Sequence, residues 1–145
     1  MGVTLLNMRF ESVRVYMTFC CFYILRALVQ AFFIMTRLDG RIWFDPGITA
    51  FTVPYDDTDD YYYSGHLGSL VVWGCEYYNQ GYRCMTIYCA LLVVLMWGFL
   101  TLMRVHYFID LISGVMIAHW FTFHGDWISF FWDVKILGLP HQKRK

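Results

Sequence analysis

Three residues from two distant segments of the sequence can together supply a nucleophile, an orienting carboxylate and a general acid: His106, Asp110 and His66. His106 and Asp110 are four residues apart in an apolar run that predicts a helix, so their side chains should share one face. A carboxylate that accepts a hydrogen bond from one imidazole nitrogen fixes the tautomer and makes the other nitrogen a better nucleophile or base. A second histidine can then protonate the departing oxygen.

The tripeptide Ser64-Gly65-His66 precedes another apolar run, which predicts that Ser64 is the N-cap of a helix. A helix start offers backbone N–H groups and the positive end of the helix dipole, and both attract anions. Ser64 and Gly65 are therefore candidate phosphate-binding residues. Together the two segments predict attack on phosphorus by one imidazole and protonation by the other.

The elements that carry these residues have the composition of a membrane protein. Of the 145 residues, 59% are hydrophobic and only 15% are charged. Four windows come close to the roughly 20 apolar residues needed to cross a bilayer, namely 13–36, 64–81, 84–103 and 105–123. We therefore expect an all-α integral membrane bundle of four transmembrane helices in a single domain, 1–145. Lys plus Arg equals Asp plus Glu at 11 each, which gives no reason to expect nucleic acid as a partner.

Charge asymmetry predicts which helix ends lie together. Basic residues gather near both chain ends and at the joint around Arg83, whereas the loop 37–63 holds an acidic run at 56–60. Because basic residues stay on the cytoplasm-like side, both termini should lie inside and the acidic loop outside. His66 and His106 then reach the same outer face. The aromatic residues at 127–132 predict an interfacial segment after the fourth span.

The motifs Y-S-G-H-L-G at 63–68 and R-V-H-Y-F-I-D-L-I-S-G at 104–114 resemble paired motifs of the lipid phosphate phosphatase superfamily. The likeness is to its branch of sphingomyelin synthases and phosphatidylcholine:diacylglycerol cholinephosphotransferases. The segment Y-I-L-R-A-L-V-Q at 23–30 is similar to the arginine-bearing helix of that branch. Members of the branch have six spans, and the matched region begins at the third, so two helices of their bundle have no counterpart among the expected spans.

The resemblance implies that His106 forms a phosphohistidine, that Asp110 orients it, and that His66 is the general acid for a leaving diacylglycerol. A ceramide or another diacylglycerol would then accept the phosphocholine, with no metal and no other cofactor. Arg104 fits the cholinephosphotransferase pattern and is expected to bind phosphate. The threonine that usually follows the second His-Tyr pair is replaced by Phe108.

Arg26 and Glu76 lie inside expected spans, so both must face other helices or water. Counted at about 1.5 Å per residue, they lie at similar depths, which predicts a buried ion pair between them. The alternative is that Arg26 reaches Asp110 or a lipid phosphate. The residues His119, His124 and Asp126 match no common metal-site spacing, so we expect no metal there.

Tyr61, Tyr62 and Tyr63 directly follow the acidic run. Carboxylates beside aromatic faces can hold a quaternary ammonium group. The alternative interpretation is a solvated acidic loop with a belt of interfacial tyrosines. The sequence favours the second interpretation and leaves the first open.

Two functions follow from these patterns. The first is a phospholipid head-group transferase or lipid phosphatase-like enzyme in an endomembrane of the ER or Golgi. The second is a catalytically silent, shortened relative that serves as a structural subunit of a larger complex, for example in a mitochondrial inner membrane. Phospholipids and the membrane are partners in both cases, and other membrane subunits are partners in the second.

Overall fold

The computed structural model describes residues 13–33, 38–40, 42, 63–136 and 138. Within these ranges all regular structure is helical, which confirms the all-α prediction. The elements are α2 Arg14–Phe32, α3 Gly65–Asn79, α4 Arg83–Leu102, α5 Phe108–Phe130 and a π-helical segment, Phe131–Ile136, that continues α5. The acidic run, Tyr61 and Tyr62 lie outside the described residues, so the topology inferred from the charged loops stays a prediction.

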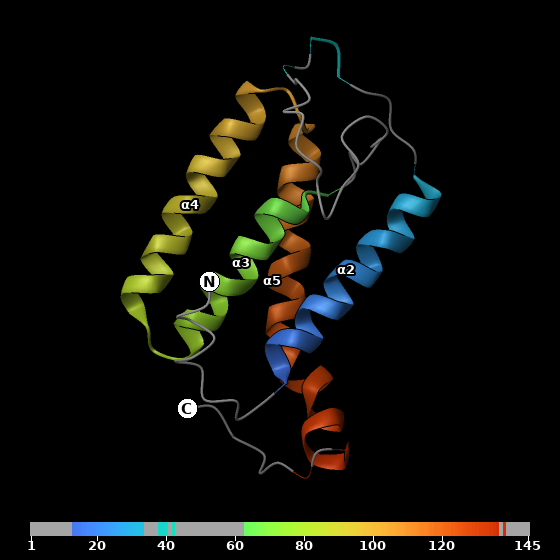
Figure 1. Ribbon diagram of the computed structural model, residues 1–145, viewed down its shortest axis with the longest axis vertical. Coiled ribbons are helices and arrows are strands. Elements are labelled where there is room, and N and C mark those ends of the chain that lie inside the picture. Colours follow the sequence, from blue (N-terminus) through green and yellow to red (C-terminus); the bar gives the residue numbers. More distant parts are fainter. Residues whose placement is uncertain (1–12, 34–37, 41, 43–62, 137, 139–145) are drawn as a thin grey trace, which may run out of the picture.

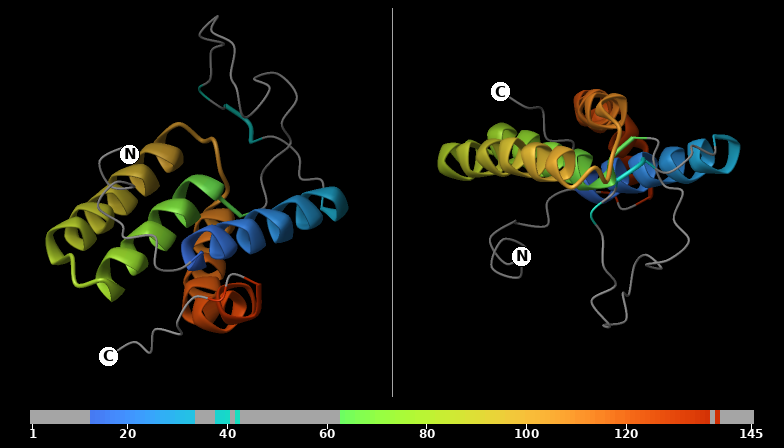
Figure 2. Two further views of the ribbon diagram at one scale, coloured as in Figure 1. Left: turned by 60° about the horizontal axis from the view of Figure 1, so that its bottom comes forward. Right: turned by 90° about the horizontal axis from the view of Figure 1, so that it is seen from above.

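Helix α3 is the central element, because it contacts each of the other three helices. In Figure 1, α4 and α2 lie on either side of α3, and α5 lies behind it. The chain runs in the same direction along α3 and α5 and in the opposite direction along α2 and α4 (Figures 1 and 2). The start of α3 therefore lies at the same end of the bundle as the start of α5.

The joint between α3 and α4 is the tight hairpin that the sequence predicts. The Tyr82 N–H donates to the Tyr77 carbonyl oxygen at 2.9 Å, and the Gly81 N–H donates to the Tyr78 carbonyl oxygen at 3.0 Å. This pair of bonds is a Schellman turn, which needs a residue in the left-handed region. Gly81 supplies it with a φ of 82°, so α3 ends after 15 residues.

Helix α5 is longer than the sequence predicts. The sequence predicts a fourth span over 105–123 and a separate interfacial segment after it, but the helix begins at Phe108 and continues to Phe130 and into the π-helical segment. The packing of Gly125 against α2 explains why α5 continues beyond residue 123. A Cβ there would meet Arg14 Nε and Thr18 Oγ1 at 2.9 Å, so this part of α5 is a packing surface for α2 and not a chain end.

Two of the described helices, α2 and α4, are long and apolar enough to cross a membrane, with mean hydropathies of 1.6 and 2.2. Helix α3 is about 22 Å long, shorter than the roughly 30 Å hydrocarbon core. Helix α4 carries a row of large apolar side chains that are more than half exposed. The members of this row are Ile87, Tyr88, Leu91, Val94, Leu95, Phe99 and Leu102.

The core has two parts, one on each side of α3. On one side Phe22 of α2 packs with Tyr63, Val72, Ala118 and Phe121. On the other side a second cluster joins α3, α4 and α5 through Leu67, Leu100 and Leu111. Because α3 contributes to both parts, its position is determined from two directions.

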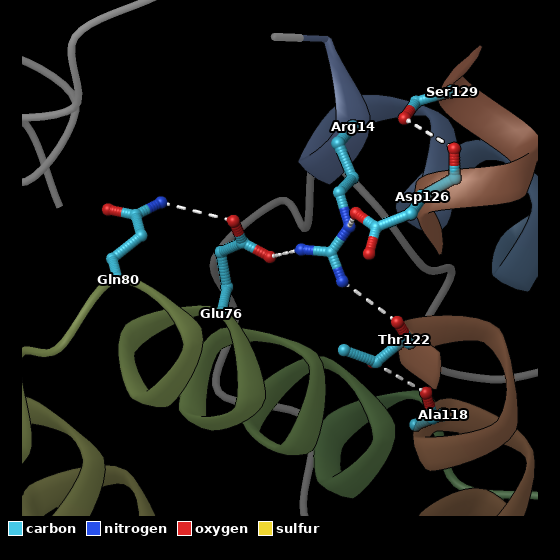
Figure 3. Close-up of polar contacts among 7 residues, drawn as sticks. All are labelled: Arg14, Glu76, Gln80, Ala118, Thr122, Asp126 and Ser129. Atoms are coloured by element: carbon cyan, nitrogen blue, oxygen red, sulfur yellow. Dashed lines mark hydrogen bonds and ion pairs between the residues drawn. The ribbon is translucent and has the colours of Figure 1, made fainter. Parts of the chain in front are cut away.

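A buried arginine joins three helices at the end of the bundle that lies away from the histidines. Arg14, 4% exposed, forms an ion pair with Glu76 of α3 and contacts Asp126 of α5 at 2.9 Å (Figure 3). Its guanidinium also donates to the Thr122 carbonyl oxygen at 2.8 Å, and Gln80 donates to Glu76 at 3.1 Å. The polar groups of Arg14 thus fix how α2, α3 and α5 are aligned along their axes.

The expected ion pair between Arg26 and Glu76 is therefore wrong. Arg14 and Arg26 are 12 residues apart on α2, and Gly65 and Glu76 are 11 residues apart on α3. Because the two helices run in opposite directions, each of these arginines lies near a different end of α3. Arg14 forms the ion pair with Glu76, and Arg26 lies beside Gly65.

Replacement of Arg14 by methionine should lower the free energy of unfolding by about 3 kcal/mol, because a buried carboxylate at Glu76 loses its cation. The double variant Arg14→Met/Glu76→Met should regain most of that loss. The measurement is thermal or denaturant unfolding in detergent. Arg83→Met, at an exposed position on α4, is the matched control, and an Arg14→Met loss no larger than that of the control would contradict the role of Arg14.

Candidate functional site

The two histidines face each other across the junction of two helices. Their ring centroids are 6.3 Å apart and the ring planes are inclined by 64°. His66 is exposed in the first turn of α3, whereas His106 is 8% exposed and lies just before α5. The expected proximity of the two imidazoles is therefore confirmed, and their catalytic roles stay a prediction.

Asp110 approaches His106, but not from the same helix as expected. His106 Nδ1 lies 3.8 Å from Asp110 Oδ2, and His106 precedes the first helical residue, Phe108. The same carboxylate oxygen accepts the Tyr107 N–H at 2.9 Å and so caps the start of α5. The helix begins late because Tyr107 is extended, with a ψ of 151°, and the cap keeps Asp110 next to His106 all the same.

The other oxygen of Asp110 is an unusual buried group. The side chain of Asp110 is fully buried, and its Oδ1 has no hydrogen-bond partner among the described residues. A buried polar atom without a partner costs about 1–3 kcal/mol. Such a cost is typical of sites where function, and not packing, selects the residue.

The start of α3 is attached directly to the backbone of α5. The Ser64 N–H donates to the Asp110 carbonyl oxygen at 3.0 Å. A Cβ on Gly114 would lie 2.7 Å from the Ser64 carbonyl oxygen, so only glycine permits this approach. Ser64 is the N-cap of α3, as predicted, and its hydroxyl accepts the Leu67 N–H at 3.5 Å. This contact brings His66 to His106.

Tyr63 and Gly68 attach the same segment to α2. The Tyr63 hydroxyl donates to the Phe22 carbonyl oxygen at 2.6 Å, and burial raises the pKa of this phenol, which keeps the proton in place. The Phe22 ring occupies the space where a Cβ of Gly68 would be, 2.1 Å from its terminal carbon. Tyr63 is fully buried, so its expected place in an interfacial belt of tyrosines is wrong, while its part in substrate binding stays a prediction. In the structure its ring packs in the core and its hydroxyl binds the backbone of α2.

Arg26 lies at the start of α3. An added Cβ on Gly65 would be 3.2 Å from both the central guanidinium carbon and Nε of Arg26. The guanidinium is half-buried beside the backbone that carries His66. A positive group therefore lies beside the positive end of the α3 dipole, at the place where the sequence predicts an anion.

Arg104 lies near the site in sequence but is bound elsewhere. Its guanidinium is exposed and donates to the Asp39 carbonyl oxygen at 3.3 Å, beside Gly40. The backbone of Arg104 ends α4 in a Schellman turn, in which the Val105 N–H donates to the Leu100 carbonyl oxygen at 3.1 Å. No described contact brings Arg104 to either histidine.

Backbone strain is concentrated around the two histidines. Among the described residues, only Tyr63 and Arg104 have a positive φ without being glycine, at 45° and 51°. Each precedes a histidine by two or three positions. Non-glycine residues in this region cost about 1–2 kcal/mol and cluster at functional sites.

No protein-family model, no curated protein and no solved structure matches the chain. The resemblance to lipid phosphate phosphatases therefore rests on the motif pair and on the segment at 23–30 alone. Nor do the described residues contain a group of three His, Cys, Asp or Glu side chains that could hold a metal ion.

Substitution of Gly114 by alanine should destabilise the protein by about 1–3 kcal/mol, because the new methyl group meets a backbone oxygen that cannot move aside. The melting temperature in detergent measures the effect. Gly98→Ala is the matched control, since nothing lies within 4 Å of that position in α4, and there alanine should be neutral or stabilising. Equal effects of the two substitutions would contradict the close contact.

Substitution of Arg104 by glycine and by alanine separates backbone strain from side-chain contacts. Both variants lose the contact with Asp39, but only glycine accepts a positive φ without cost. Arg104→Gly should therefore be more stable than Arg104→Ala by about 1 kcal/mol. Unfolding measured on the two variants tests this, and a more stable alanine variant would show that the turn is not left-handed.

Proposed function

We propose that the chain is an integral membrane protein that transfers or hydrolyses a phospholipid head group of the phosphocholine type. One observation carries the proposal. The imidazole of His66 on α3 and that of His106, just before α5, face each other with centroids 6.3 Å apart, and a buried carboxylate lies 3.8 Å from His106. This is the arrangement of nucleophile, orienting group and general acid that the chemistry needs.

The helices support the membrane assignment. Helices α2 and α4 have the length and hydropathy of spanning segments, and α4 carries a row of exposed apolar side chains. A contiguous apolar surface of this kind is costly in water and normal in lipid. The ionisable side chains of Arg14 and Glu76 are buried within the bundle, as intramembrane charges usually are.

In the proposed reaction, the His106 Nε2 lone pair attacks phosphorus while the bond to the diacylglycerol oxygen breaks. His66 donates its proton to that oxygen, so neutral diacylglycerol leaves and a phosphohistidine remains. Asp110 stabilises the positive charge that develops on the His106 ring. A second alcohol then attacks phosphorus, gives its proton to His66 and releases His106. Water in place of the alcohol gives the phosphatase reaction.

The start of α3 and Arg26 supply the positive field for the phosphate. The helix dipole and the first N–H groups of α3 favour an anion at this end. The Arg26 guanidinium lies against Gly65 in the same place. Charge that develops on the phosphoryl oxygens in the transition state would be stabilised by both groups. Arg104, which is bound to the Asp39 carbonyl, is not needed in this scheme.

A structural subunit is the second candidate. The observation that favours it is that motif residues also have packing roles. Asp110 caps α5, Gly114 accepts the close approach of Ser64, and Tyr63 binds the backbone of α2. A silent relative would keep these residues for stability alone, and the exposed apolar surface of α4 would then contact other membrane subunits.

The deciding experiment is head-group exchange in proteoliposomes that contain phosphatidylcholine and a fluorescent ceramide or diacylglycerol. His106→Ala should lower the rate by at least about a thousandfold, as expected when a covalent nucleophile is removed. His66→Ala should lower it by about a hundredfold or more. Fluorescent product, separated from its precursor, is the measurement.

His124→Ala is the matched control, because His124 is held by the Trp120 carbonyl on α5 and lies outside the site. It should leave the rate unchanged. Transfer that persists in His106→Ala would contradict the proposed nucleophile. A well-folded protein without transfer to ceramide, diacylglycerol or water would favour the structural subunit.

A further inference from the structure

A cysteine and a histidine lie together in the wall of a pocket away from the candidate site. The Sγ atom of Cys75 on α3 and Nδ1 of His119 on α5 are 3.8 Å apart, close enough for a hydrogen bond that involves sulfur. A thiol beside an imidazole is a nucleophile beside a general base. Neither residue belongs to the motifs at 63–68 and 104–114, so the proposed function gives this pair no role.

The pocket that contains the pair lies between α3, α4 and α5 and has a volume of about 640 Å³. Small-molecule sites typically have volumes of about 300–1,000 Å³. Large parts of its wall are apolar and are formed by Leu70, Val71, Ala90, Val93 and Phe123. Such a wall is complementary to a hydrocarbon chain.

The thiol lies near the end of α3 that leads into the hairpin with α4. Cys75 is four residues before Asn79, the last residue of α3, so its depth from that helix end is about 6 Å. In the opposite direction the pocket continues to Leu70 and Val93, and Val93 also packs against the second core cluster. A chain attached at Cys75 would therefore extend from the hairpin end into the apolar part of the pocket.

We propose that Cys75 is a site of S-acylation, which takes a long acyl chain from an acyl thioester and holds it in this pocket. An acyl thioester has a hydrocarbon chain for the apolar wall and an electrophilic carbonyl carbon for the thiol. Tyr78 and Asn79 at the hairpin end are exposed, so the polar carrier of the thioester stays outside the bundle. The proposed function does not enter this inference, since neither His66 nor His106 lines the pocket.

The reaction is an exchange of one thiol for another. His119 Nδ1 takes the proton of the Cys75 thiol while the sulfur attacks the carbonyl carbon. The bond from Cys75 sulfur to the acyl carbon forms, and the bond from that carbon to the carrier sulfur breaks. The carrier thiolate then receives the proton from His119. One thioester replaces another, so atoms and charge balance without a further reactant. A phospholipid ester is a poorer donor, because an alkoxide leaves less readily than a thiolate.

A metal ion is a poorer partner for the pair than an acyl group. Cys75 and His119 could supply two ligands, but the described residues contain no group of three His, Cys, Asp or Glu side chains that could hold an ion. Protein zinc sites have at least three protein ligands. The apolar wall would also leave a hydrated cation without polar partners.

The test treats the full chain in nanodiscs with alkyne-tagged palmitoyl-CoA and locates the label by mass spectrometry. Cys84 is the internal control, because it is exposed in the first turn of α4 at the same end of the bundle. Cys75 should be labelled at least about tenfold faster than Cys84, as expected for a thiol with an adjacent base. Hydroxylamine should remove the label, as it does from a thioester. Equal labelling of the two cysteines would overturn the proposal.

Two variants test the part of the histidine. His119→Gln keeps a polar side chain that cannot accept the thiol proton, so it should slow the labelling of Cys75 by about a hundredfold. His124→Gln is the matched control on the same helix, because His124 is held by the Trp120 carbonyl oxygen, and it should leave the rate unchanged. An unchanged rate in a folded His119→Gln protein would overturn the proposed chemistry.

The pocket is tested through the length of the chain. Acetyl-CoA, whose acyl group is too short to use the apolar wall, should lose most of the preference for Cys75. Ala90→Trp, which fills the pocket, should slow transfer from palmitoyl-CoA, and Leu95→Trp, outside the pocket on the same helix, should not. Melting curves identify any variant that fails to fold. An equal preference for Cys75 with the two donors would contradict the role of the pocket.

Discussion

The contact between the Ser64 backbone and α5 is the constraint on which the candidate site depends. A hydrogen bond from the Ser64 N–H to the Asp110 carbonyl and the absence of a side chain at Gly114 bring the start of α3 against the first turns of α5. Each helix start is adjacent to a histidine. Two residues 40 positions apart in the sequence therefore become neighbours through backbone contacts, and the imidazoles themselves need no mutual attraction.

The opposite end of the bundle is held by charge and not by close backbone contact. Arg14 links α2, α3 and α5 where burial makes each unsatisfied group costly. The two ends determine the alignment of α3 independently. Between them, the packing of Phe22 against Gly68 and of Leu67 against Leu111 fills the space on both sides of the helix. A change at either end should therefore tilt α3 and move His66 relative to His106.

The sequence predicts the helices and the meeting of the histidines because hydrophobic runs and motif positions are local signals. The short joints between α3 and α4 and between α4 and α5 then set the relative directions of these three helices. The Arg26 and Glu76 pairing fails for a different reason: counting depth from helix ends assumes that the ends of α2 and α3 are level. In the structure Arg26, six residues before α2 ends at Phe32, lies beside Gly65 at the start of α3. Glu76 therefore lies level with Arg14, more than three helical turns earlier on α2.

Other features of the site depend on tertiary contacts that leave no periodic signal. Tyr63 belongs to an aromatic triplet in the sequence, yet it is buried, and its hydroxyl donates a hydrogen bond to the Phe22 carbonyl oxygen. His106 leaves the helix because Arg104 adopts a left-handed conformation and Tyr107 an extended one. Gly114 is the last residue of the motif at 104–114. Its role, which is to leave space for the Ser64 backbone, follows only from the contact between α3 and α5.

Proximity of positions 66 and 106 in the folded protein is the most direct test of this account. Cysteines would replace both histidines in a chain whose five native cysteines are changed to alanine, and a short bis-thiosulfonate reagent would be applied in proteoliposomes. We predict efficient intramolecular cross-linking of the 66/106 pair and none for a 66/124 pair. Absence of the first cross-link in folded protein, or equal yields for the two pairs, would contradict the account.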